Sequence, residues 1–350
     1  MPPFLPGVQL AREYWFEVVA PVLDAHVPSP ERAAALLFTG SDVLGFDTEQ
    51  STDHGWGPRV FVFLPDGTEP ARLRELVDVV DGALPDAFRG FPTRFPPRDG
   101  MPPCHQVWFR TVGGFVDATL GFDPRHGVGA RDWLRTPTQL LRELTAGAVF
   151  EDGLGDLTRV RAELAWYPDD VWRYVLACQW RRIAQEEAFV GRCGQVGDEL
   201  GSAIVAARLV RDVVRLGFLI ERDYAPYSKW LGTAFARLPC ATALRTPMQQ
   251  TLAATDWQHR EAHLCLVLER VAERFNQLEL VEAIDPVVRP FFRRPFRVLD
   301  ANRFADACFA STSLRALGWA GAVDQFFDST DVLSGPQHVA AVAASHIWTE

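Results

Sequence analysis

The sequence predicts an α+β fold, with an α/β domain over residues 1–135 and an all-α domain over residues 136–350. The apolar runs Ala33–Phe38 and Val60–Leu64 have the length of strands and stand among segments with a helical pattern, which indicates a mixed sheet with helices. After Thr136-Pro137, an apolar period of 3.6 residues dominates nearly to the C-terminus. A chain of 350 residues is long enough for two domains and a sizeable core.

The elements of the first domain follow from the apolar spacing and from the positions of proline and glycine. Gly90–Pro103 holds five prolines and two glycines and is expected to be a long loop, either a lid over a site or a plain surface crossover. The remaining segments are a helix, two strands, a helix and a strand, in the order Val8–Ala25, Ala33–Phe38, Val60–Leu64, Glu69–Leu84 and Gln106–Phe115.

The second domain begins where Pro137 can occupy the first turn of a helix capped by Thr136. The clearest helices are expected at Val171–Val190, Ala203–Arg222 and Trp257–Leu278. In the second of these, apolar residues recur at i, i+4, i+8 and i+11 and form one face, which comprises Val205, Leu209, Val213 and Leu216.

The composition excludes several classes of protein. A net charge of −10 argues against general nucleic-acid binding, which needs a basic surface, but does not exclude nucleotides. No apolar run approaches the 18 or so residues of a membrane span, and no secretory signal is visible. The six cysteines are scattered without a C-x-x-C pair, so we expect a reduced, cytoplasmic protein without a zinc ribbon. The oligomeric state is not predicted.

The most informative motif lies between the first two strands and reads Gly40-Ser41-Asp42-Val43-Leu44-Gly45, then Ser51-Thr52-Asp53-His54-Gly55-Trp56. It resembles the signature of nucleotidyltransferases of the DNA polymerase beta type. In that signature a strand ends in Gly-Ser, a helix starts, and the next strand carries Asp-x-Asp. The second aspartate of this pair is Gly55 here.

The resemblance implies a site for phosphates and Mg²⁺. Gly40 and Ser41 would hold the phosphates, because a glycine turn lets the backbone approach them. Nucleotidyl transfer commonly uses two divalent cations held by carboxylates, and aspartates two apart on a strand point to one face. Asp53 is the expected ligand and catalytic carboxylate, and Asp42 or Asp47 would replace the missing aspartate. With Gly55 present, Mg²⁺ would be weakly bound or absent.

A third carboxylate of that site is expected on a later strand. The candidate strand, Gln106–Arg110, contains no acid, and Asp117 is the nearest one along the chain.

A longer stretch, Gly40–Leu64, narrows the resemblance to the nucleotidyltransferase-fold family catalogued as domain of unknown function number 4037. Three further segments are similar to that family: Leu120–Pro124, Trp166–Trp172 and Tyr224–Trp230. Members usually read Asp-His-Asp-Trp where this chain reads Asp53-His54-Gly55-Trp56. The reaction of the family is poorly defined, so the resemblance implies a fold and a site more firmly than a substrate.

A second group of candidates lies in the helical domain. By the resemblance, Tyr227, Ser228 and Lys229 would grip the triphosphate, and Lys229 is the only lysine of the chain. Lysine supplies a compact charge, and serine or tyrosine a neutral donor, to phosphate oxygens. Arg211 would add a charge, because it shares one helix face with two other arginines, Arg208 and Arg215. The alternative is a solvated arginine face paired with Asp212 and a lysine on a loop.

Other candidates carry competing interpretations. Glu187 would be a general base for an acceptor hydroxyl, beside Glu186, which would pair with Arg182 at i, i+4. His54 would be a ligand, an acid/base group, or a histidine packed behind the strand.

Two further groups of residues point to weaker hypotheses. His259 and His263 share a helix face but lack an evident third zinc ligand. The arginine- and phenylalanine-rich run 289–297 would either touch phosphate or a partner, or dock by its aromatic rings with arginines at the rim.

Together these residues predict an enzyme that transfers a nucleotidyl group from a nucleoside triphosphate to a small-molecule acceptor. The reaction would depend on Mg²⁺, and the site would lie in the cleft between the two domains. Two alternatives stay open: an inactive relative that binds a ligand as a regulator, and an enzyme that runs metal-independent chemistry on small molecules.

Overall fold

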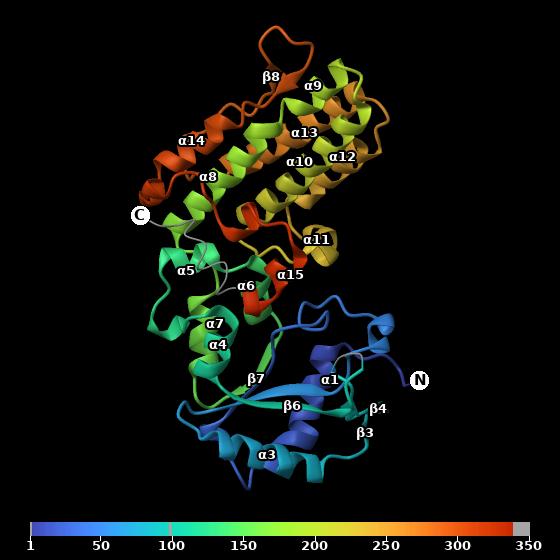
Figure 1. Cartoon of the computed structure of the whole chain (residues 1–350), viewed down its shortest axis with the longest axis vertical. Coiled ribbons are helices and arrows are strands. Elements are labelled where there is room, and N and C mark those ends of the chain that lie inside the picture. Colours follow the sequence, from blue (N-terminus) through green and yellow to red (C-terminus); the bar gives the residue numbers. More distant parts are fainter. Residues whose placement is uncertain (1, 98–99, 339–350) are drawn as a thin grey trace. The chain divides into compact units, whose positions relative to one another are not determined.

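The structure is a computed structural model, and it describes residues 2–97 and 100–338 (Figure 1). One part contains a mixed five-stranded sheet with helices, and the other part is built almost entirely from helices. This arrangement confirms the α+β fold class.

The described residues form two compact units. The sheet unit comprises the chain up to Val128 together with Leu140–Ala165. The helical unit comprises Gly129–Gln139 together with the chain from Trp166 onward.

The sheet has the strand order β5–β6–β2–β1–β7. β2 runs parallel to β6 and antiparallel to β1, while β5 and β7 are antiparallel edge strands. The strands expected at Ala33–Phe38 and Val60–Leu64 are confirmed as β1 and β2. The bounds are β1 Ala33–Leu36, β2 Arg59–Leu64, β5 Arg94–Phe95, β6 Cys104–Thr111 and β7 Ala148–Asp152.

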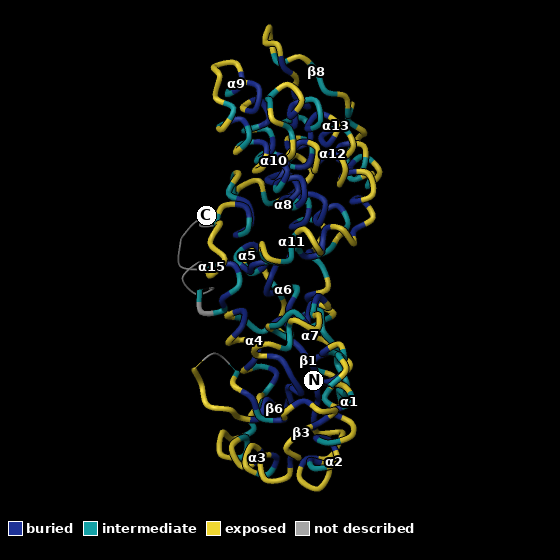
Figure 2. The backbone as a smooth tube through the Cα atoms, turned by 90° about the vertical axis from the view of Figure 1, so that its right-hand side faces the viewer, coloured by how far each residue is buried: buried dark blue, intermediate teal, exposed yellow. Residues whose placement is uncertain are grey.

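Both faces of β2 are buried, since side chains alternate along a strand and each face is covered. Val60 and Val62 lie in the main core of the unit, together with apolar residues of α1 and α3 (Figures 1 and 2). Phe61 and Phe63 project from the opposite face, where both rings contact Phe115 of α4 at centroid distances of 5.3 Å. The continuous apolar run of β2 is therefore explained by burial on both sides.

The helices of the sheet unit complete these layers. The expected helix at Val8–Ala25 is confirmed as a continuous helical run, α1 followed by a π-helical turn and α2. Two short strands form a separate hairpin. The bounds are α1 Gly7–Tyr14, the π-turn Trp15–Val19, α2 Ala20–Leu23, 3₁₀ turns at Ser29–Glu31, Glu49–Asp53 and Pro124–His126, α3 Pro70–Ala83, β3 Ala87–Phe88, β4 Phe91–Pro92, α4 Val112–Leu120, α6 Thr138–Thr145 and α7 Asp156–Glu163.

The structure differs from the expectations at four places in this unit. The segment Gly90–Pro103, expected to be a long loop, contains the short strands β4 and β5, which form through pairing with β3 and β6. No helix follows Gly40-Ser41; residues 40–46 form turns, in which the N–H of Phe46 donates to the carbonyl of Ser41 at 2.8 Å. The third strand ends at Thr111, because its side chain accepts a hydrogen bond from the N–H of Gly114 and caps α4. The strand β7 was not predicted, since its five residues are strand through pairing with β1.

The helical unit holds the helices expected at Val171–Val190, Ala203–Arg222 and Trp257–Leu278, with the first divided between α8 and α9. The bounds are α5 Ala130–Arg135, α8 Asp169–Glu186, α9 Phe189–Gln195, α10 Glu199–Ile220, α11 Ser228–Phe235, α12 Ala241–Ala253, α13 Trp257–Asn276, β8 Arg289–Pro290, β9 Arg297–Val298, α14 Asn302–Ala310, 3₁₀ turns at Ser313–Leu317, Val323–Gln325 and Pro336–His338, and α15 Thr330–Ser334.

The core of the helical unit lies along α8 and α10, and more than half of the residues of each helix are buried (Figure 2). α10 begins at an aspartate cap, because Asp198 accepts the N–H of Gly201 at 2.7 Å. Its predicted apolar face is confirmed by Leu209, Val213 and Leu216, which are fully buried. No helix in the described ranges is both long and apolar enough to span a membrane.

The arginine- and phenylalanine-rich run forms the hairpin of β8 and β9. Phe296 is buried against Ala188 and Val298, as the docking interpretation predicts. Phe292, at the turn, is 85% exposed. Some of the aromatic rings of this segment therefore pack against the helical unit, and others face the solvent.

Candidate functional site

The Gly-Ser motif of the sheet unit surrounds a buried ion pair. The guanidinium of Arg59, the first residue of β2, donates to both carboxylate oxygens of Asp42, with its Nε 3.0 Å from Oδ2. It also donates to the carbonyl of Thr39 at 2.8 Å. Gly40 has a φ of +137°, and a Cβ there would collide with both charged groups. Gly40 and Asp42 thus have a structural explanation in this pair.

The other two predicted metal ligands do not join Asp42. Asp47 accepts the N–H of Gly7 at 2.7 Å and the indole N–H of Trp56 at 3.2 Å. Asp53 ends a 3₁₀ turn six residues before β2, so the rule for aspartates on a strand does not apply to it. Among the described residues, no group of three or more His, Cys, Asp or Glu side chains could hold a metal. The carboxylates as placed here do not fit a resident Mg²⁺ site.

Asp53 is nevertheless the accessible carboxylate of the motif. Its side chain is 68% exposed, and one oxygen lies 2.6 Å from Nδ1 of His54. His54 is itself 72% exposed, so the expectation that it packs behind the strand is wrong. Ser41 lies in the turn between Gly40 and Asp42.

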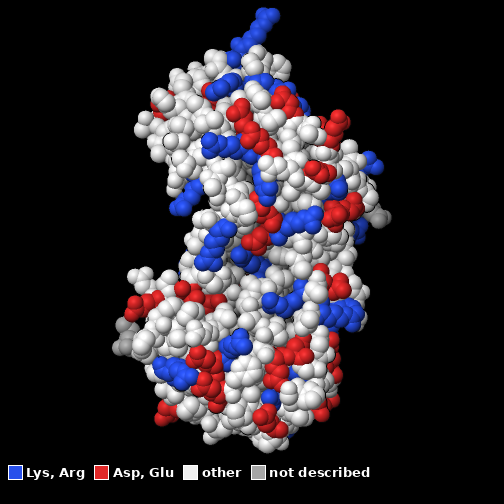
Figure 3. Space-filling view, turned by 180° about the vertical axis from the view of Figure 1, so that it is seen from behind, with Lys and Arg blue, Asp and Glu red and all other residues white. Residues whose placement is uncertain are grey.

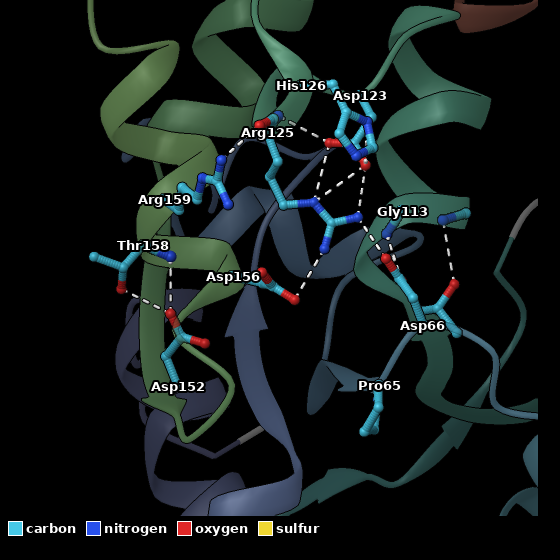
Figure 4. Close-up of polar contacts among 12 residues, drawn as sticks. Pro65, Asp66, Gly113, Asp123, Arg125, His126, Asp152, Asp156, Thr158 and Arg159 are labelled. Carbon is cyan, nitrogen blue, oxygen red and sulfur yellow. Dashed lines mark hydrogen bonds and ion pairs between the residues drawn. The ribbon is translucent and has the colours of Figure 1, made fainter.

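A second polar network lies after the carboxyl ends of β2 and β6 (Figure 4). Arg125 is nearly buried and pairs with Asp66, Asp123 and Asp156, the last at 2.9 Å. The pKa of Asp123 lies below its usual value because Arg125 donates to it. The N–H of Gly113 adds a bond of 3.0 Å to Asp66. The ion pairs of Arg125, together with the bond between Gly113 and Asp66, therefore link four segments of the sheet unit.

A pocket lies within the helical unit, with a volume of about 290 Å³. Its lining comes from α8, α10, the start of α6, the segment before α8, the start of α11 and the C-terminal segment. The lining residues are Thr138, Gln139, Trp166, Tyr167, Val175, Gln179, Arg211, Arg215, Phe218, Leu219, Asp223, Ala225, Pro226, Tyr227, Ser228, Leu231, Ala322, Asp324, Gln325, Asp328, Thr330 and Leu333.

Three residues expected to bind the nucleotide line this pocket: Arg211, Tyr227 and Ser228. Ser228 is the first residue of α11, and the backbone N–H of Tyr227 donates to Gln139 at 2.9 Å. Lys229 follows on the same first turn and is exposed, with its ammonium 5.1 Å from the ring centroid of Trp230. In the described part of the chain Lys229 has no acidic partner.

The charges around the pocket are mixed. Arg211 pairs with Asp328 at 2.6 Å, and Arg215 donates to the backbone carbonyl of Asp324 at 2.6 Å. The carboxylate of Asp324 accepts the N–H and the hydroxyl of Thr138, and burial raises its pKa. Asp223 also lines the pocket. The lining of the pocket therefore contains both signs of charge.

The remaining ion pairs of the unit correct two expectations. Arg182 pairs with Asp212 rather than with Glu186, and Glu186 pairs with Arg208. Basic and acidic side chains are likewise interspersed on the face that Figure 3 shows.

Glu187 is buried and does not line the pocket. Its two carboxylate oxygens accept the backbone N–H groups of Leu299, Asp300 and Ala301 at 2.8–3.2 Å. Burial raises its pKa to about 7, against the opposing effect of these hydrogen bonds. The carboxylate is thus occupied in holding the turn before α14. His259 pairs with Asp256 at 2.7 Å, and no metal site forms around it in the described chain.

Several pocket residues were not singled out in the sequence, among them Gln179, Phe218, Asp324 and Gln325. They are spread over 147 residues of the chain, and no local pattern joins them. Trp166 and Tyr167 belong to a segment noted for its family resemblance, but no ligand role was derived for them.

Fold and pocket together define an α+β protein with a pocket in its helical unit. Residues 133–231 match the family model described as a domain of unknown function, DUF4037. The match confirms the expected family over these residues, while the nucleotidyltransferase fold stays a prediction. No curated protein matches the chain.

Proposed function

We propose that the protein is a nucleotidyltransferase-like protein that binds a nucleoside triphosphate in the pocket of the helical unit. The nucleotidyl group would pass to a small-molecule acceptor. The observation that carries the proposal is the meeting of Arg211, Tyr227 and Ser228 at the wall of one pocket. Arg211 lies on α10, and Tyr227 and Ser228 lie at the start of α11.

The start of α11 suits a phosphate group. The first N–H groups of a helix have no partner within it, and the helix dipole favours negative charge there. Ser228 adds a hydroxyl, Lys229 an ammonium without an acidic partner in the described chain, and Arg211 a guanidinium from α10. Guanidinium and ammonium groups are the usual phosphate ligands of proteins.

The acidic residues that line the pocket bear on the form in which the nucleotide binds. Asp223 and Asp328 would repel a bare triphosphate, so we expect the nucleotide to bind as its Mg²⁺ complex. The metal then arrives with the substrate, in agreement with the poor fit of the sheet-unit carboxylates to a resident ion.

Isothermal titration with ATP, GTP, CTP and UTP, each with and without Mg²⁺, tests the proposal. We expect micromolar binding that depends on Mg²⁺ and weakens by about tenfold in Lys229→Ala, since one charge-assisted contact is lost. Arg192→Ala is a control, because Arg192 lies on α9, which contributes no residue to the pocket, whereas Lys229 lies on α11, which lines the pocket through Ser228 and Leu231. Absence of binding to all four nucleotides under both conditions would refute the proposal.

Ligand binding without transfer is the second candidate function. It is favoured by the engagement of Asp42 with Arg59 and by Gly55 in the place of an aspartate, which leave Asp53 as the accessible carboxylate of the motif. Such a protein would keep the nucleotide pocket as a sensor or regulatory site.

The substitution Gly55→Asp separates the two candidates. Gly55 has a φ of +58°, which aspartate tolerates better than most residues, and a Cβ there would meet only the carbonyl of Pro97 at 3.7 Å. If the protein is a transferase weakened by the loss of an aspartate from its Asp53-His54-Gly55 motif, Gly55→Asp raises the Mg²⁺-dependent release of pyrophosphate. A metabolite mixture serves as the source of the acceptor. Gly55→Asn is the matched control without charge. Equal release from both variants and the natural protein favours binding without transfer.

A further inference from the structure

Three buried hydrogen-bond donors of the pocket residues have no partner. They are the indole N–H of Trp166, the hydroxyl of Tyr167 and the Nε–H of Arg211, all of which lack an acceptor in the described structure. Tyr167 is only 3% exposed. Unpaired buried polar atoms are rare in proteins, so three on the lining residues of one pocket need an explanation.

The missing partners are acceptors. Indole and guanidinium nitrogens can only donate, and burial raises the pKa of Tyr167 well above its ordinary value, so its hydroxyl keeps its proton. Other polar groups of the pocket are already paired: the amide of Gln325 donates to the side chain of Gln179 at 3.0 Å, and Thr138 bonds to Asp324. The unmet demand in the pocket is therefore for oxygen or nitrogen lone pairs.

The shape of the wall indicates what carries these lone pairs. The rings of Trp166, Tyr167 and Phe218 line the pocket, whose volume of about 290 Å³ leaves room for an aromatic heterocycle that packs on them. Bases stack on such rings regardless of their identity, so the selection among bases falls to the polar groups.

We infer that the buried part of the pocket takes a planar ring bearing carbonyl oxygens, which in a nucleotide is an oxo base such as uracil in preference to adenine. This inference rests on the proposed nucleotide binding. The edge of uracil presents two carbonyl acceptors and one N–H donor, so it offers one acceptor each to the indole N–H of Trp166 and the hydroxyl of Tyr167 and leaves Arg211 to the phosphates. The corresponding edge of adenine presents one ring-nitrogen acceptor beside an amino donor and satisfies one of these two groups.

Tyr167→Phe removes one of the unpaired donors and keeps the ring. In the free protein the midpoint of urea unfolding is expected to stay the same or rise, since an unsatisfied buried hydroxyl is lost. Tyr174→Phe is the matched control, because the hydroxyl of Tyr174 accepts the N–H of Gly321 at 3.1 Å and its removal is expected to lower the midpoint.

Titration with UTP and ATP, both with Mg²⁺, completes the test. We expect UTP to bind at least about tenfold more tightly than ATP, and Tyr167→Phe to weaken UTP binding by about 5- to 100-fold while changing ATP binding little. Equal binding of both nucleotides, or an equal effect of Tyr167→Phe on both, overturns the inference and leaves the proposed function intact. Binding of neither nucleotide refutes the proposed function itself. A loss of unfolding stability in Tyr167→Phe equal to that in Tyr174→Phe shows that the hydroxyl has a partner in the free protein, and it also overturns the inference.

Discussion

Replacing Arg59 with methionine is expected to lower the free energy of unfolding by about 3–5 kcal/mol, because it leaves the buried carboxylate of Asp42 without its countercharge. The side chain of Asp42 is 2% exposed and that of Arg59 is 8% exposed, so water cannot replace the lost bonds. Arg59 also bonds to the carbonyl of Thr39, which would lose its donor. Urea unfolding monitored by tryptophan fluorescence measures the change.

Two further variants show whether burial of the pair is the cause. The double variant Asp42→Leu with Arg59→Met removes both charges and is expected to be more stable than either single variant. Arg72→Met breaks an exposed pair with Glu75 and is expected to cost less than about 1 kcal/mol. A cost for Arg59→Met as small as that for Arg72→Met would contradict the structural role assigned to the Gly-Ser motif.

Arg211→Ala is expected to weaken binding of Mg²⁺–UTP by roughly 10- to 100-fold, the second large effect in this protein. Arg211 lines the pocket from α10, and its guanidinium is one of the groups proposed to bind the phosphates. Asp328 holds that guanidinium in the ligand-free protein at 2.6 Å. Asp328→Asn is therefore expected to act in the opposite direction and to strengthen binding, because it frees the guanidinium.

The matched control for Arg211→Ala is Arg208→Ala, one helical turn away on α10. Arg208 pairs with Glu186 and does not line the pocket, so its loss is expected to leave nucleotide affinity unchanged. Titration calorimetry on the three variants gives the affinities. Equal weakening by Arg208→Ala and Arg211→Ala would point to a general charge effect and against a contact in the pocket.

The sequence predicted the elements whose signal is local. β1, β2, α3, α10 and α13 each carry an apolar spacing that identifies their type without knowledge of the rest of the chain. β7 carried no such signal, because five residues between two helices become a strand only by pairing with β1. The end of β6 was misplaced for a related reason: the apolar residues after Thr111 belong to α4, which a single capping bond starts.

In the candidate site, too, the residues that carry a local sequence signal were predicted, and those that depend on distant partners were not. Arg211, Tyr227 and Ser228 were found in the sequence through helix spacing and family resemblance, and the structure brings them to one pocket. The burial of Asp42 and Glu187 could not be foreseen, since their partners lie 17 and more than 100 residues away. A carboxylate that bonds to a distant arginine or turn looks the same in a sequence as one that is free for catalysis.

The most direct test of nucleotide binding in the helical unit is a crystal structure of the protein with Mg²⁺ and UTP. We expect the phosphates at the start of α11, near Ser228 and Lys229, with Arg211 in contact and the uracil ring beside Trp166 and Tyr167. A nucleotide bound elsewhere, for instance at Gly40 and Ser41 with this pocket empty, would contradict the proposal.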